Sequence, residues 1–153
     1  MLVMTPRRPV KIRTEVPVEP KKSARSLDEL LAERIDLRWA LLGLVAMVGA
    51  NIAAAMLEPA PANPNLPDPW FVTLTATVVT LAMLAAFGGL LARRRWGMAL
   101  SLFSAAIGVV MVVACPLSGH HTFGLWWVGE IACMVAWAGV SLAGVRSSAA
   151  RAS

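Results

Sequence analysis

Four long apolar runs alternate with short polar segments along the chain. Each run is close to the roughly 20 residues that an α-helix needs to cross about 30 Å of hydrocarbon. Transmembrane β-strands are about half that length and alternate in polarity, so the pattern indicates helices. The sequence therefore predicts an all-α fold, a four-helix transmembrane bundle with spans at residues 39–57, 70–92, 96–114 and 123–145.

The segments between these runs carry residues that turn the chain. Residues 58–69 contain five prolines, residues 93–95 are three consecutive arginines, and residues 115–122 contain a proline and a glycine. Proline removes a backbone donor and clashes with the preceding helical turn. We therefore expect each of these segments to be a loop, with helix three ending before Cys115.

The N-terminal part differs from the rest in composition. Residues 1–25 are rich in proline and charge and lack aromatic residues, which predicts a disordered tail. Ser26 and Glu29 then form a capping-box pattern. Leucine and isoleucine recur at helical spacing after it, so residues 26–38 are predicted to form a short amphipathic helix at the membrane interface, able to continue into the first span.

Composition and charge placement refine this prediction. Hydrophobic residues make up 58% of the chain and charged residues 15%, too few to cover a soluble domain. The fourteen lysines and arginines lie within residues 7–38, 93–95 and 146–151. Because cytoplasmic loops carry the excess of basic residues, we expect both termini, including the tail at 146–153, to be cytoplasmic. The composition suggests a bacterial-type plasma membrane, and the positive charge indicates orientation rather than nucleic-acid binding.

Polar residues within the spans suggest how the helices associate. In lipid, small residues permit close packing and polar side chains hydrogen-bond between helices. We expect the side chain of Asn51 to bond to another helix. Thr73 and Thr77 of the second span are expected to bond to their own preceding turn or to a neighbour.

One acidic residue, Glu130, lies inside an apolar run. A carboxylate within the membrane is costly and should face the bundle interior or a wet cleft. One interpretation is structural, with a neutral carboxyl donating a hydrogen bond to Asn51 or to a threonine of the second span. The other is a proton-relay or substrate-binding group. Trp126 lies one helical turn before Glu130 and shares its face.

Further candidate chemistry lies just before the fourth span. Cys115, His120 and His121 are borderline or soft ligands that suit zinc or copper. Their spacing is not that of a structural zinc site, which has four ligands, so ordinary polar loop residues are the favoured interpretation and no cofactor is predicted. No nucleophile triad, phosphate-binding loop or carboxylate pair is recognisable, and no enzyme activity is predicted.

These observations predict a small multi-pass membrane protein whose surroundings are the lipid bilayer. The leading hypothesis is a non-catalytic accessory or scaffold subunit that packs against itself or a larger membrane complex. The first alternative is an oligomeric small-solute or proton-coupled transporter or channel, with an outward-facing vestibule. A weaker alternative is a metal- or redox-handling protein. The candidate functional cluster is Glu130, His120, His121, Cys115 and Trp126.

Overall fold

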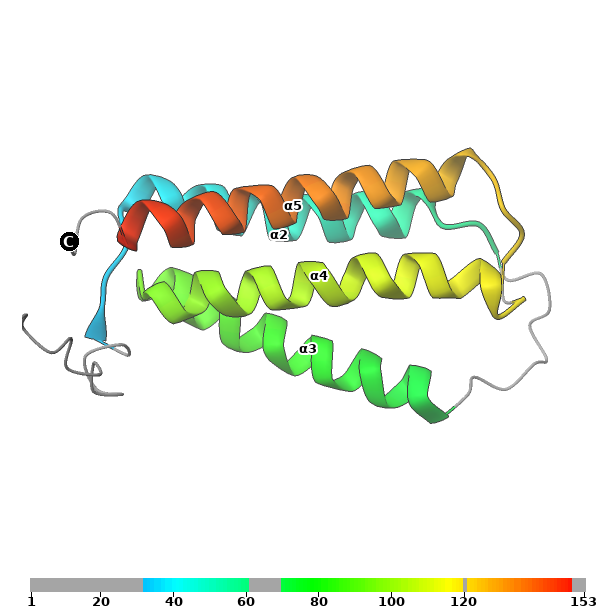
Figure 1. Cartoon of the computed structure of the whole chain (residues 1–153), viewed down its shortest axis with the longest axis horizontal. Coiled ribbons are helices and arrows are strands. Elements are labelled where there is room, and N and C mark those ends of the chain that lie inside the picture. Colours follow the sequence, from blue (N-terminus) through cyan, green and yellow to red (C-terminus); the bar gives the residue numbers. More distant parts are fainter. Residues whose placement is uncertain (1–31, 61–69, 120, 150–153) are drawn as a thin grey trace, which may run out of the picture.

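The computed structural model describes residues 32–60, 70–119 and 121–149, with side chains as far as residue 147. This part of the chain forms four long helices that lie side by side along one axis (Figure 1). Each is long and apolar enough to cross a membrane. The predicted all-α membrane bundle is confirmed. The helices are α2 (Leu37–Leu57), α3 (Trp70–Leu91), α4 (Arg95–Leu117) and α5 (Leu125–Ala149).

Helix α5 packs between α2 and α4, whereas α3 packs mainly against α4. In Figure 1, α3 converges on α4 at the end where the two helices are joined and leans away from it toward Trp70. The buried residues of α3 all lie near that junction, at Ala86, Gly89 and Leu90. Most of the other large apolar side chains of α3 are exposed, as expected of a lipid-facing helix, although Met83 packs against the core.

Two glycines, which the sequence analysis did not single out, allow the close approach of α3 and α4. A Cβ atom on Gly89 would lie 2.6 Å from the Cα atom of Gly97. A Cβ atom on Gly97 would lie 2.5 Å from the carbonyl carbon of Gly89. The two backbones therefore touch, which is the use that membrane helices make of small residues.

The core of the bundle contains a buried methionine, Met98, and a small network of hydrogen-bonded side chains. Met98 of α4 is fully buried and fills the space beside Gly43 of α2 and Gly144 of α5. Further along the α4–α5 contact, the indole N–H of Trp137 donates to the Ser101 hydroxyl oxygen at 2.8 Å. That oxygen lies 3.0 Å from the Ser141 hydroxyl oxygen. These groups satisfy one another where no water is expected.

The segment before α2 is extended rather than helical. The Ile35 amide donates to the Arg93 carbonyl oxygen at 2.9 Å, and the Arg95 amide donates to the Glu33 carbonyl oxygen at 3.0 Å. The side chains of Arg95 and Glu33 also form an ion pair at 2.7 Å. The predicted helix at 26–38 is therefore wrong for residues 33–36, because the arginine loop offers this backbone partners. Residues 26–31 lie outside the described residues.

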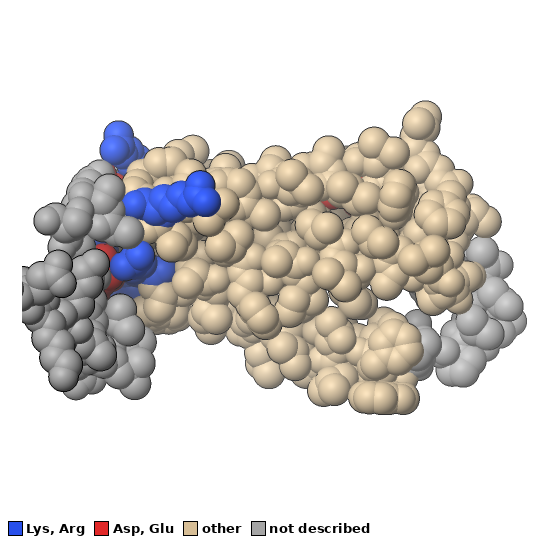
Figure 2. Space-filling model, in the orientation of Figure 1, with Lys and Arg blue, Asp and Glu red and all other residues tan. Residues whose placement is uncertain are grey.

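One end of the bundle, called the basic end below, carries the arginines of the described chain. Figure 2 shows the blue side chains gathered there, while the rest of the visible described surface is almost entirely uncharged. The start of the described segment and the end of α5 lie at this same end (Figure 1). The grouping agrees with the predicted topology, and the side of the membrane that it faces stays a prediction. The arginines at the basic end are Arg34, Arg38, Arg93, Arg94, Arg95 and Arg146.

Candidate metal site

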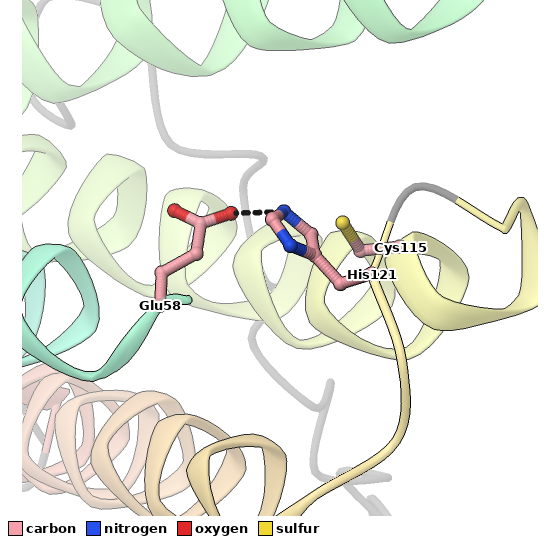
Figure 3. A group of neighbouring side chains, drawn as sticks. All are labelled: Glu58, Cys115 and His121. Atoms are coloured by element: carbon pink, nitrogen blue, oxygen red, sulfur yellow. Dashed lines mark ion pairs between the residues drawn. The ribbon is translucent and has the colours of Figure 1, made fainter. Parts of the chain in front are cut away.

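Three potential metal ligands meet at the opposite end of the bundle, called the site end below (Figure 3). Glu58 follows the last residue of α2, Cys115 lies in the last turn of α4, and His121 lies in the connection to α5. One carboxylate oxygen, one sulfur and one ring nitrogen from these residues all lie within 4.8 Å of one another. The site therefore joins the end of α2 to the end of α4 and the segment that follows it, which lie far from α2 in the sequence.

An ion-pair contact in the group links Glu58 to His121. Nε2 of the imidazole lies 3.1 Å from Oε1 of the carboxylate, as the dashed line in Figure 3 marks. The histidine side chain is 2% exposed and the glutamate side chain 48% exposed. The group therefore has a buried nitrogen ligand and a carboxylate that solvent can reach.

The end of α4 is shaped by a proline that stays inside the helix. Pro116 has no amide hydrogen to give to the carbonyl oxygen of Val112, one turn earlier. The indole N–H of Trp127, from α5, donates to that oxygen instead, at 3.0 Å. The helix continues to Leu117 as a result, so the prediction that it ends before Cys115 is wrong, and the start of α5 is tied to the end of α4.

The chain then reverses within a few residues. The Ser118 hydroxyl donates to the carbonyl oxygen of Cys115 at 2.7 Å, and the Gly119 amide donates to that of Pro116 at 3.2 Å. Gly119 has φ of 76°, a left-handed conformation that glycine adopts without a steric penalty. This tight reversal brings the connection to α5 back over the helix end, so that His121 lies beside Cys115.

Trp126 packs against one of the candidate ligands, His121. Its ring meets the imidazole of His121 edge to face, with ring centroids 5.5 Å apart. Its indole N–H donates to the carbonyl oxygen of Thr122 at 2.9 Å, which fixes the ring against the connecting segment. Tryptophan does not ligate metals, so Trp126 of the predicted cluster takes part only by packing against His121.

Glu130 lies deeper in the bundle and is 4% exposed. Its Oε1 atom is buried and has no hydrogen-bond partner among the described residues. Asn51, an expected partner, instead donates to the carbonyl oxygen of Met47 in its own helix, at 2.7 Å. The prediction that Asn51 bonds to another helix is therefore corrected.

The threonines of α3 behave in the simpler of the two expected ways. The Thr77 hydroxyl donates to the carbonyl oxygen of Thr73 at 2.8 Å, one turn earlier in the same helix. Their hydrogen bond lies on the exposed surface of α3. The Thr77 hydroxyl is therefore satisfied within its own helix and does not connect α3 to Glu130.

The structure brings together part of the predicted cluster and adds one member. Cys115, His121 and Trp126 are neighbours, whereas His120 lies outside the described residues. Glu58 was missed because it was grouped with the proline-rich loop. A signal was present, since Glu58 directly follows a predicted span and Cys115 directly follows another that should end on the same side. Neither Cys115 nor Cys133 forms a disulfide bond.

The ligand set fits a zinc ion in type, and small movements of the side chains would give it the spacing of a zinc site. Thiolate, imidazole and carboxylate are the usual zinc ligands, and metal–ligand bonds of about 2.0–2.3 Å place tetrahedral ligand atoms roughly 3.3–3.8 Å apart. The three candidate atoms, within 4.8 Å of one another, need to move by only about 1 Å to reach that spacing. A fourth position would remain open to water or to another group.

Comparison with known proteins adds no family to this description. No protein-family model matches the chain, and no curated protein or solved structure gives a significant match. Its function is therefore inferred from its own residues.

Proposed function

We propose that this protein is a non-catalytic accessory protein of the plasma membrane that binds a divalent transition-metal ion, for which zinc is the best fit. The observation that carries the proposal is the meeting of Glu58, Cys115 and His121 within 4.8 Å. The positive-inside rule supports a cytoplasmic basic end and both termini in the cytoplasm, so the site end would face away from the cytoplasm.

Charge balance supports a divalent ion. The Glu58 carboxylate and the Cys115 thiolate together carry two negative charges, and a neutral His121 adds none. An ion of charge +2 would therefore leave the three-ligand site neutral, which matters at the edge of a low-dielectric membrane. The exposed carboxylate gives the ion a route of entry, and the buried imidazole gives it a dry, fixed ligand.

The proposal is tested by calorimetric titration of the purified protein in lipid nanodiscs with zinc. The wild type should bind one equivalent of zinc. Cys115→Ser and His121→Gln should weaken binding by more than about tenfold, because each removes a direct ligand and even outer partners of ligands are worth that much. Cys133→Ser is the matched control, since Cys133 is the other cysteine and is not part of the ligand group.

Two results would contradict the proposal. One is a wild-type protein that binds no zinc. The other is equally tight binding by the Cys115→Ser and Cys133→Ser variants. Either result would leave the group as an ordinary histidine–glutamate contact beside a cysteine.

A cation transporter is the second candidate function. The observation that favours it is the buried Oε1 atom of Glu130, inward of the same end and without a hydrogen-bond partner in the described chain. Proteoliposomes with a trapped zinc indicator distinguish the two functions. A transporter gives uptake that Glu130→Gln abolishes, whereas a binding protein gives none.

A further inference from the structure

Glu130 is a buried carboxyl with no cationic side chain near it in the described chain. The arginines of the described residues lie at the basic end, and these residues include no lysine. Arg146, on the same helix, is about 24 Å further along α5 at 1.5 Å per residue. The other acidic residue of the described chain at this end is Glu58, and the residues next to the two acids are in contact, since a Cβ atom on Gly129 would lie 3.0 Å from Cδ1 of Leu57.

A carboxylate in that position needs compensation. Inside a membrane protein, acidic residues are paired with cations or hydrogen-bonded, or mark an ion pathway, because an isolated charge costs several kcal/mol. Two of the predicted partners, Asn51 and Thr77, donate to carbonyl oxygens of their own helices instead. No described side chain is seen to compensate a charged Glu130, so the carboxyl either stays protonated or binds a cation that enters from outside the bundle.

The position of Glu130 connects it to the metal ligands. Glu130 lies one turn along α5 from Trp126, about 6 Å along the helix axis. The ring of Trp126 is in contact with the imidazole of His121. Val112 of α4, whose carbonyl oxygen binds Trp127, flanks the same region. Among the described residues, Glu130 is thus the next acidic group inward from a cation held at the site end.

We propose that Glu130 is the inner carboxylate of a two-position cation site, in which a divalent transition-metal ion held by Glu58, Cys115 and His121 can also be bound further in by Glu130. This inference rests on the proposed metal-binding function and extends it. It assigns to Glu130 a direct role toward the ion in place of a structural role between helices. Glu58, Cys115 and His121 would then be the rim ligands of the site. The inner position extends the site further into the bundle, where the ion is held away from solvent.

The test compares the zinc affinity of four nanodisc-embedded proteins by calorimetry. Glu130→Gln should bind zinc about tenfold more weakly than the wild type, as expected for loss of a group that supports a metal site. Glu130→Asp, which keeps the charge, should recover part of the loss. Glu33→Gln is the matched control, because it removes a carboxylate at the basic end and should leave the affinity unchanged.

Thermal unfolding without zinc separates this role from a structural one. The proposal predicts that Glu130→Gln unfolds at the same temperature as the wild type or a higher one, since it removes an uncompensated acid. Equal zinc affinity of the wild type and Glu130→Gln would overturn the inner position while leaving the rim ligands intact. Absence of zinc binding by the wild type would overturn the proposed function itself, and the inner position with it.

Discussion

The indole N–H of Trp127 donates to the carbonyl oxygen of Val112 at 3.0 Å. That oxygen is the one that Pro116 leaves without its usual helical donor. The bond has two effects, since it lets α4 extend through the proline and holds the first turn of α5 against it. Cys115 lies in the last turn of α4, and His121 lies in the segment between α4 and α5. The bond that holds these two helices together therefore supports the candidate metal site, although it involves none of the ligands.

Replacement of Trp127 by Phe should lower the free energy of unfolding by about 1 kcal/mol, the typical net value of one hydrogen bond. In a Pro116→Ala background the loss should be smaller, because alanine, unlike proline, has an amide hydrogen to donate to the Val112 carbonyl oxygen. Denaturation of the wild type, the two single variants and the double variant in mixed micelles measures this coupling. An equal loss in both backgrounds would show that the indole does not replace the missing amide.

The contact between α3 and α4 gives a second prediction with an internal control. Gly89→Ala should destabilise the protein by about 1–3 kcal/mol, because the new methyl group would meet the backbone of Gly97 at 2.6 Å. Gly88→Ala should be nearly neutral, since nothing lies within 4 Å of its Cβ position. Thermal unfolding of the two variants in the same detergent measures the difference. Similar melting temperatures would contradict the close approach of the helices.

Zinc affinity should fall as the solution is made more acidic. The metal binds the thiolate of Cys115 and the neutral imidazole of His121, so protons compete for both ligands. A change from about pH 7.5 to about pH 5.5 raises the proton concentration about a hundredfold, and these protons compete with the metal for the ligand atoms. Calorimetric titrations at the two pH values should show weaker binding at the lower one. An affinity that does not change with pH would argue against these two ligands.

The fold was largely predictable from the sequence, because apolar runs of membrane-spanning length leave little choice of structure. The helix ends were less predictable where a distant residue decides them. Pro116 is of a type that often ends helices, yet it lies inside α4, where the Trp127 indole donates to the carbonyl oxygen that the proline leaves without a donor. Residues 33–36 looked helical, and the arginine loop draws them into an extended pairing.

The candidate site was predictable only in part. Cys115 and His121 are close in sequence and were grouped for their chemistry. Glu58 joins them through the packing of α2 against α5, which no local pattern reveals. Glu130 could be predicted as a buried acid. Its hydrogen-bond partners could not, because the sequence does not show which way a neighbouring side chain points. Asn51, for example, donates to the carbonyl oxygen of Met47 in its own helix.

The most direct measurement is the absorption spectrum of the protein loaded with cobalt, which replaces zinc and reports its ligands. Cobalt bound at Glu58, Cys115 and His121 should give the strong visible bands of a tetrahedral centre and a sulfur-to-metal charge-transfer band in the near ultraviolet. Cys115→Ser should remove the charge-transfer band, and Cys133→Ser should retain it. Wild-type protein that shows the spectrum of free cobalt would contradict the metal site.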